Sequence, residues 1–193
     1  AIRQALASKV MVLTGGPGTG KTTTTRGIID LLAARGCEIV LAAPTGLAAK
    51  RMSEATGRES KTIHRMLGYS SAGGYEKNED NPLEGDVLIV DESSMIDIIL
   101  MYNLLKAAPD SMGVILIGDA DQLPSVGAGN VLLDIYTSEV VPVVRLTTIY
   151  RPAQASNINL NPPRNKRGEF PALTGGKRRT FYHIADKEPP HIT

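Results

Sequence analysis

The stretch GGPGTGKT at residues 15–22 has the residue types and the spacing that hold nucleotide phosphates. It matches the full pattern G-x-x-x-x-G-K-[ST], whose glycines let backbone N–H groups turn inward around phosphate oxygens. In this pattern the lysine ammonium neutralises the β- and γ-phosphates and the final hydroxyl ligates Mg²⁺. The sequence therefore predicts a site for a nucleotide and Mg²⁺, formed by Gly15, Gly16, Pro17, Gly18, Thr19, Gly20, Lys21, Thr22 and Thr23.

Two carboxylates, Asp91 and Glu92, follow the apolar run VLIV at residues 87–90. If this strand lies beside the first one, Asp91 reaches the metal through water. Glu92 can take a proton from an attacking water, which favours hydrolysis over transfer of the phosphoryl group to a bound acceptor. The alternative is that Glu92 only begins a helix, because acidic residues suit a helix's first turn.

A second apolar run, GVILIG at residues 113–118, leads into the polar stretch DADQ. We expect Gln122 in this stretch to hydrogen-bond the γ-phosphate and the attacking water, and so to sense the state of the nucleotide. Arg151 follows a later strand-like run, where its guanidinium could stabilise the transferring phosphoryl group, although a lone arginine is usually a surface residue. The predicted metal ligands are Thr22 and Asp91, and the predicted catalytic residues are Lys21, Asp91, Glu92, Gln122 and Arg151.

Strands must alternate with helices to bring these residues together. The sequence predicts strands in apolar runs at residues 9–14, 38–43, 86–91, 113–119 and 141–147. Helical patterns lie between them, at residues 21–35, 45–56, 94–107 and 128–136. Strands that are apolar on both faces and separated by helices indicate an α/β fold: a parallel sheet with helices on both faces and ligands at the carboxyl ends of the strands.

Two segments interrupt this alternation. Residues 68–85 combine glycines with Asn-Asp-Asn-Pro turn chemistry, which predicts an inserted hairpin that turns at residues 72–74, with a disordered loop as the alternative. From residue 152 onward the chain is rich in proline, glycine, asparagine and cations. We therefore expect one phosphate-binding domain over residues 1–151, followed by a basic linker or incomplete element over residues 152–193.

The composition limits where the protein works and what it contacts. The sequence has no secretory signal pattern and no apolar run of membrane-spanning length, and its single cysteine, Cys37, cannot form an internal disulfide. A reducing cytoplasm is the setting that we expect. With two Phe, six Tyr and no Trp, the composition argues against a broad platform for stacking nucleic-acid bases. Any contact with a nucleic acid should then be mostly to phosphates.

The motifs in their order resemble the RecD-like group of superfamily 1 DNA helicases, which includes the helicase parts of conjugative relaxases. The similarity lies in LTGGPGTGKT, APTGLAAKRM, TIHRMLG, LIVDESSM, GDADQLPSVGAGN and LTTIYR. It implies a RecA-like first motor domain from an ATP-driven helicase that moves 5′ to 3′ on single-stranded DNA. It also implies that the insertion at residues 68–85 is a pin at the duplex junction and that the strand's phosphates are contacted by Pro44, Thr45, Thr62 and His64.

The same resemblance implies partners beyond this chain. A helicase of this kind needs a second RecA-like domain, and because none of its motifs occurs before Thr193 we expect a fragment with little activity alone. Single-stranded DNA and the missing second domain are the expected partners, with no membrane, and other helicase–nuclease subunits are left open. The same residues also fit two other functions. One is a non-hydrolysing nucleotide-binding module, and the other is a P-loop kinase, which would need an acceptor pocket and a lid with arginines.

Overall fold

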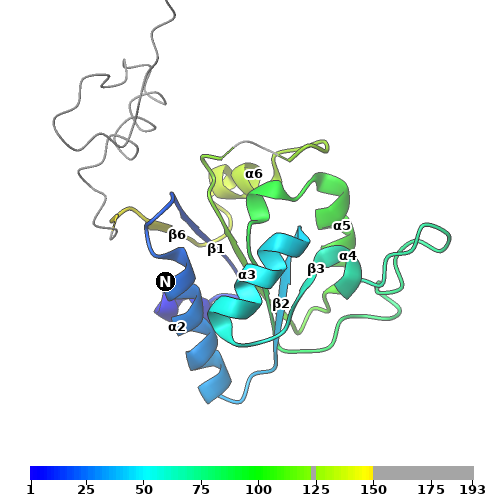
Figure 1. Ribbon diagram of the computed structural model, residues 1–193, viewed down its shortest axis with the longest axis horizontal. Helices are drawn as coiled ribbons and strands as arrows, with labels where there is room; N and C mark the ends of the chain where they lie inside the picture. The colour runs from blue at the N-terminus through cyan, green and yellow to red at the C-terminus, as the bar shows by residue number, and fades with distance from the viewer. Residues whose placement is uncertain (123–124, 150–193) are drawn as a thin grey trace, which may run out of the picture. The chain divides into compact units, whose positions relative to one another are not determined.

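The structure is a computed structural model that describes residues 1–122 and 125–149, and a parallel sheet organises them (Figure 1). Its strands lie in the order β3-β2-β4-β5-β1-β6, and every neighbouring pair is parallel. The strands are β1 Val10–Gly15, β2 Ile39–Ala43, β3 Ser60–Thr62, β4 Val87–Val90, β5 Gly113–Gly118 and β6 Val143–Leu146.

Helices cover both faces of this sheet, so the predicted α/β RecA-like fold is confirmed. The helices are α1 Ile2–Ala7, α2 Lys21–Ala34, α3 Gly46–Thr56, α4 Ile63–Met66, α5 Ile98–Ala107 and α6 Val131–Ser138, with a short 3-10 helix, η1, over Ser93–Met95. Short loops lead from β1 to α2 and from β2 to α3, and α4 begins directly after β3.

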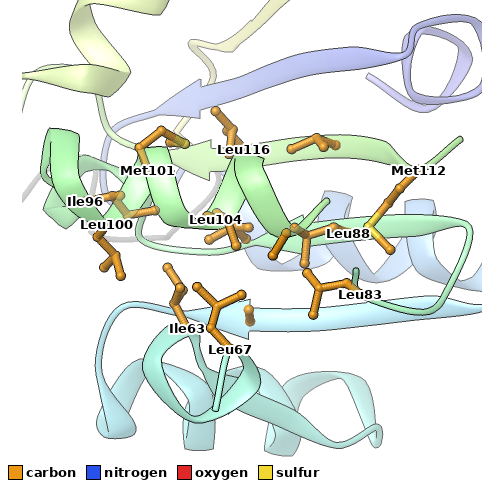
Figure 2. Packing of buried hydrophobic residues seen from close by; sticks show 14 of the residues in the cluster. Ile63, Leu67, Leu83, Leu88, Ile96, Leu100, Met101, Leu104, Met112 and Leu116 are labelled. Atoms are coloured by element: carbon orange, nitrogen blue, oxygen red, sulfur yellow. The ribbon is translucent and has the colours of Figure 1, made fainter. Parts of the chain in front are cut away.

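Successive side chains along a strand point to opposite faces of the sheet, so each face has its own hydrophobic core. Met11 and Leu13 pack on the face covered by α1, α2 and α3, whereas Val12 between them packs on the opposite face. Figure 2 shows that opposite face, where Leu100 and Leu104 of α5 and Ile63 of α4 meet side chains of the central strands. With both faces buried, the sheet fixes where each strand ends, and therefore where the polar residues after it lie.

The strand order corrects one expectation. The strand that ends before Asp91, β4, does not lie beside β1, because β5 pairs with both of them and separates them. Sequence patterns also missed α1, β3 and α4. β3 is the three-residue polar segment SKT at the edge of the sheet, so neither apolar burial nor length marks it as a strand.

The helix expected over residues 94–107 begins later, at Ile98. Asp97 caps it, because its carboxylate accepts a hydrogen bond from the Leu100 N–H at 2.8 Å. The preceding residues form η1 instead, where the Met95 N–H donates to the Glu92 carbonyl at 3.0 Å. The chain thus makes a tight turn directly after β4 before the long helix starts.

The segment at residues 68–85 projects from the body of the molecule between α4 and β4 (Figure 1). An antiparallel bridge joins Ser70 to Gly74, with backbone hydrogen bonds of 2.8 and 2.9 Å around the turn between them. Residues 1–148 form a compact unit, and the predicted basic segment at residues 152–193 lies outside the described residues. Among the described helices, none is long and apolar enough to cross a bilayer.

Candidate functional site

The phosphate loop connects β1 to α2, and its backbone is open toward an anion. Gly18 and Gly20 have φ angles of 78° and 87°, a conformation that glycine adopts readily and other residues avoid. The Thr19 hydroxyl donates to the Gly16 carbonyl at 2.8 Å and closes the turn. The N–H groups of Gly18 and Gly20 have no acceptor among residues 1–122 and 125–149. A phosphate group is the kind of ligand that would satisfy them.

The start of α2 adds to this anion site. No side chain caps the helix at Gly20, and its first turn holds no acidic residue, so the positive end of the helix dipole is uncompensated. Lys21 is the first residue of the helix, and its ammonium donates to the carbonyl oxygens of Gly15 and Gly16. In the protein alone the lysine therefore binds the loop that it would share with a phosphate.

The charge of Lys21 acts on both Asp91 and Glu92, although β5 separates their strand from β1. Burial raises the pKa of Asp91, and two weaker effects oppose it: the hydrogen bond from the Glu92 N–H, at 2.9 Å, and the charge of Lys21. Burial also raises the pKa of Glu92, with a further rise from Asp91 and opposing effects of Lys21 and Arg51. A carboxylate with a raised pKa is a better proton acceptor than an ordinary one.

Glu92 has a backbone conformation that non-glycine residues rarely adopt, with φ 51° and ψ 38°. Such strain costs free energy and persists at functional sites when the surroundings enforce it. Here the Ser93 hydroxyl donates to the Val90 carbonyl at 2.9 Å and holds the turn. Glu92 does precede η1, but its side chain makes no capping hydrogen bond, so helix initiation alone does not account for its carboxylate.

Gln122 lies in the loop after β5, the strand between β1 and β4, and this loop contacts both neighbouring strand ends. The Ala120 N–H donates to the Thr14 hydroxyl at the end of β1, at 3.0 Å. The Ser94 hydroxyl, in the turn after β4, donates to the Gln122 carboxamide oxygen at 3.4 Å. The loop after β5 is therefore connected to the ends of both flanking strands, while Arg151 lies outside the described residues.

Sequence reasoning missed the groups that hold this loop in place. Asp119 is only 4% exposed, and its carboxylate accepts from the Asp121 N–H at 3.1 Å. Arg145 of β6 donates to the Asp121 carboxylate at 3.3 Å. The pairing of Arg145 with Asp121 depends on β6 lying at the edge beside β1, and no spacing in the sequence indicates that position.

The chain itself offers few metal ligands. No group of three or more His, Cys, Asp or Glu side chains suited to a metal occurs within the part of the chain that the structure describes. Thr22 is exposed on the first turn of α2, and Asp91 directly follows β4. This donor set fits Mg²⁺ held mainly by nucleotide phosphates and water, as this ion prefers, rather than by a protein cage.

The predicted nucleic-acid contacts gather at the outer part of the same sheet edge. Pro44 and Thr45 directly follow β2, and Ala43 of β2 pairs with Thr62 of β3. Both threonine hydroxyls cap helices: Thr45 accepts from the Ala48 N–H at 3.3 Å and Thr62 from the Arg65 N–H at 3.2 Å. Because each hydroxyl acts as an acceptor in its cap, its own O–H remains available to donate to a phosphate.

His64 has aromatic neighbours that the sequence did not indicate. Its ring lies 5.4 Å from the Tyr69 ring and 6.2 Å from the Tyr75 ring, centroid to centroid. Composition counts the tyrosines but cannot show that two of them meet one histidine, because the insertion's fold brings them together. The structure thus concentrates into one place rings that the composition suggested were too few for a broad platform.

Comparisons with known proteins agree with this geometry. A family model described as an AAA domain matches residues 1–128. The chain is 46% identical over 181 residues to the ATP-dependent RecD2 DNA helicase of Deinococcus radiodurans, covering 94% of the chain and 25% of that protein. It is 42% identical over 154 residues to the RecBCD enzyme subunit RecD of Mycobacterium tuberculosis, covering 68% of the chain and 27% of that protein.

The fold also matches solved helicase structures. The Pif1 helicase of Candida albicans superimposes with a TM-score of 0.60 at 24% identity, over 83% of this chain and 41% of that one. A helicase bound to DNA, arterivirus nonstructural protein 10, gives a TM-score of 0.53 at 19% identity, over 91% and 44% of the two chains. At these identities the likeness concerns the fold. The chain spans about a quarter of the length of the curated relatives it matches.

Proposed function

The chain belongs to the AAA domain family and, within it, to the RecD-like superfamily 1 helicases as a first motor domain, and from this premise we propose what it does. It binds Mg-ATP and single-stranded DNA, and ATP hydrolysis drives 5′ to 3′ movement when the domain works against a second RecA-like domain. The observation that carries this proposal is the electrostatic effect of Lys21 on Asp91 and Glu92 at the end of a sheet whose outer strands lead to the expected DNA contacts.

In this proposal each group at the sheet edge has one task. The loop N–H groups and Lys21 bind the β- and γ-phosphates, and Thr22 and Asp91 hold Mg²⁺, which supplies charge neutralisation on the phosphates when bound. Glu92 accepts the proton of the attacking water, and its raised pKa suits that task. Gln122 orients the water, and Arg151 stabilises charge on the transferring group.

The DNA strand crosses the ends of β2 and β3. Pro44, Thr45, Thr62 and His64 contact its phosphates, which gives grip without dependence on base sequence. The insertion at residues 68–85 acts as a pin at the duplex junction. Its carboxylates would repel a phosphate backbone, which suits a wedge between strands better than a clamp around one; they are Glu76, Glu79, Asp80 and Glu84, with Asp86 directly after the segment.

The relatives suggest the setting of the complete enzyme. Mycobacterium tuberculosis RecD is named as a subunit of the RecBCD enzyme, so the parent of this chain could work with further helicase–nuclease subunits. The Deinococcus protein is named as a DNA helicase, and its name mentions no complex. A cytoplasmic location, as expected from the sequence, is part of the proposal.

Phosphate release with Mg-ATP tests this function directly. We expect slow release from the chain alone, because the second domain's contribution to the site is missing, with a clear increase on adding oligothymidylate and loss of release in Glu92→Gln. Nucleotide binding without release in any variant would contradict hydrolysis and support the non-hydrolysing binding module. Release that oligothymidylate does not change would contradict the motor proposal.

A further inference from the structure

Three aromatic rings form a surface cluster where the insertion leaves α4. We call His64, Tyr69 and Tyr75 the aromatic cluster. The two tyrosine rings lie 4.9 Å apart with planes tilted by 49°. The His64 ring meets Tyr69 edge-on, at 77° between planes, and lies roughly parallel to Tyr75, at 29°. These distances are within the range at which aromatic rings attract one another.

Backbone contacts keep the cluster in place. The Tyr69 N–H donates to the His64 carbonyl at 2.9 Å, which fixes Tyr69 directly beyond the end of α4. The Lys77 N–H donates to the Leu67 carbonyl at 3.1 Å and returns the chain to the same helix after Tyr75. Tyr75 is half-buried against the core on the α4 and α5 face of the sheet, whereas Tyr69 is 51% exposed. The cluster therefore has an inner ring that anchors it and an outer ring that faces solvent.

Such an outer ring is more than the insertion's packing requires. Tyr75 already fixes the insertion to the core, and a tyrosine that served only this purpose would be buried. Tyrosine also loses little side-chain entropy when it binds, because it has only two rotatable side-chain bonds. An exposed ring held from behind by a second ring is the arrangement on which a nucleic-acid base can stack.

The charges around the aromatic cluster indicate how a DNA strand would be oriented on it. Lys61 and Arg65, on β3 and α4, are exposed beside His64, and Arg58 precedes them. Lys61 pairs with Glu59 at 3.8 Å, whereas Arg65 makes no ion pair with the residues that the structure describes. The insertion beyond Tyr75 is acidic. A phosphate backbone is therefore attracted to the α4 side of the cluster and repelled by the insertion, which leaves a base pointing at the rings.

We propose that the aromatic cluster is a stacking site for one unpaired base of single-stranded DNA, with Tyr69 as the ring that the base contacts and Tyr75 and His64 as its support. The inference rests on the proposed binding of single-stranded DNA and adds a base contact to a surface otherwise expected to touch phosphates. Because every base has an aromatic face, the site binds without regard to sequence and sits where the strand meets the pin.

The test measures the affinity of the full chain for labelled oligothymidylate by fluorescence anisotropy, against the same oligonucleotide made abasic throughout. The variants are Tyr69→Ala, Tyr69→Phe and, as the matched control, Tyr102→Ala, which removes a tyrosine that is 61% exposed on α5. We expect Tyr69→Ala to bind oligothymidylate on the order of tenfold more weakly, and Tyr69→Phe and Tyr102→Ala to bind like the wild type.

The abasic strand separates stacking from a structural role. If Tyr69 stacks on a base, wild type and Tyr69→Ala bind the abasic strand equally, because the base that Tyr69 contacts is missing. If Tyr69→Ala weakens binding of both strands by the same factor, Tyr69 only supports the loop and the stacking site is wrong. Wild-type binding that the abasic change leaves unaltered would refute stacking while preserving DNA binding. No wild-type binding to either strand would overturn the proposed function as well.

Discussion

Two features of Glu92 are unfavourable for folding: its strained backbone conformation and its half-buried charge. Its φ of 51° lies in the left-handed region, and burial together with the Asp91 charge raises the pKa of its carboxyl. Neither feature stabilises the fold. Both fit the role proposed for Glu92, because a carboxylate with a raised pKa is a better acceptor for a proton from water. At the scale of the residue, the proposed function accounts for features that folding alone would disfavour.

The raised pKa predicts how stability depends on pH. A carboxyl group whose pKa is higher in the folded than in the unfolded state stabilises the fold at low pH, and that contribution is lost as pH rises through the folded pKa. Ionised Glu92 therefore destabilises the fold at neutral pH. We expect Glu92→Gln to raise Tm by a few degrees at about pH 8 and to lose this advantage as pH falls toward the ordinary carboxyl range.

Thermal unfolding of both proteins across pH, without nucleotide, measures this effect. Glu79→Gln is the control, because it removes an exposed carboxylate from the insertion and should leave Tm nearly unchanged at every pH. A Tm difference between Glu92→Gln and the wild type that stays constant with pH would mean that the charge of Glu92 is not the cause.

At the scale of elements, the sequence predicts which apolar runs form strands but not which strands lie side by side in the sheet. Runs such as VLIV at residues 87–90 show burial on both faces in the sequence itself, and the α/β fold follows from their alternation with helices. The position of β5 between β1 and β4 depends on how crossovers pack, which no local pattern encodes. The same limit applies to the site: the sequence indicated Lys21 and Glu92 by motif, but not the pairing of Arg145 with Asp121.

The link between the phosphate loop and β6 predicts a stability effect. A methyl group on Gly15 would lie 2.7 Å from the Thr19 hydroxyl oxygen and 2.8 Å from the Leu146 carbonyl oxygen, whereas one on Gly16 would meet nothing within 4 Å. We expect Gly15→Ala to lower the free energy of unfolding by about 1–3 kcal/mol. Gly16→Ala should be close to the wild type in denaturant unfolding without nucleotide. Equal stability of the two variants would contradict the close approach of β6.

Thr45 has two roles that substitutions can separate: it caps α3, and it is expected to contact DNA. We expect Thr45→Ala to cost about 1 kcal/mol in unfolding, because the Ala48 N–H loses its acceptor. Thr45→Asp should keep the cap and the stability, since aspartate caps well, yet bind single-stranded DNA more weakly because its charge repels phosphate. Urea unfolding and fluorescence anisotropy give the two readouts. Thr45→Asp with unchanged DNA affinity would remove Thr45 from the strand contacts.

For the molecule as a whole, the parallel sheet brings the candidate site residues that the structure describes to the carboxyl ends of its strands. β2 connects the candidate nucleotide site to the expected DNA contacts most directly. The Asp91 N–H donates to the carbonyl of Ala42 in β2 at 3.0 Å, and the chain after β2 continues into Pro44 and Thr45. A change at the γ-phosphate is thus separated from the expected DNA contacts by a single strand end. The opposite edge carries none of the predicted site residues within the described part of the chain, although Lys9 lies there, directly before β1.

Lys9 and Lys21 therefore flank β1 at opposite ends of the strand and allow a matched test of the central claim, that the carboxyl edge of this sheet is a Mg-nucleotide site. The measurement is the affinity for a non-hydrolysable ATP analogue with Mg²⁺, by isothermal titration calorimetry, in the wild type, Lys21→Ala and Lys9→Ala. We predict that the wild type and Lys9→Ala bind alike and that Lys21→Ala loses binding by at least about tenfold. Equal binding by all three proteins, or none by the wild type, would contradict the claim.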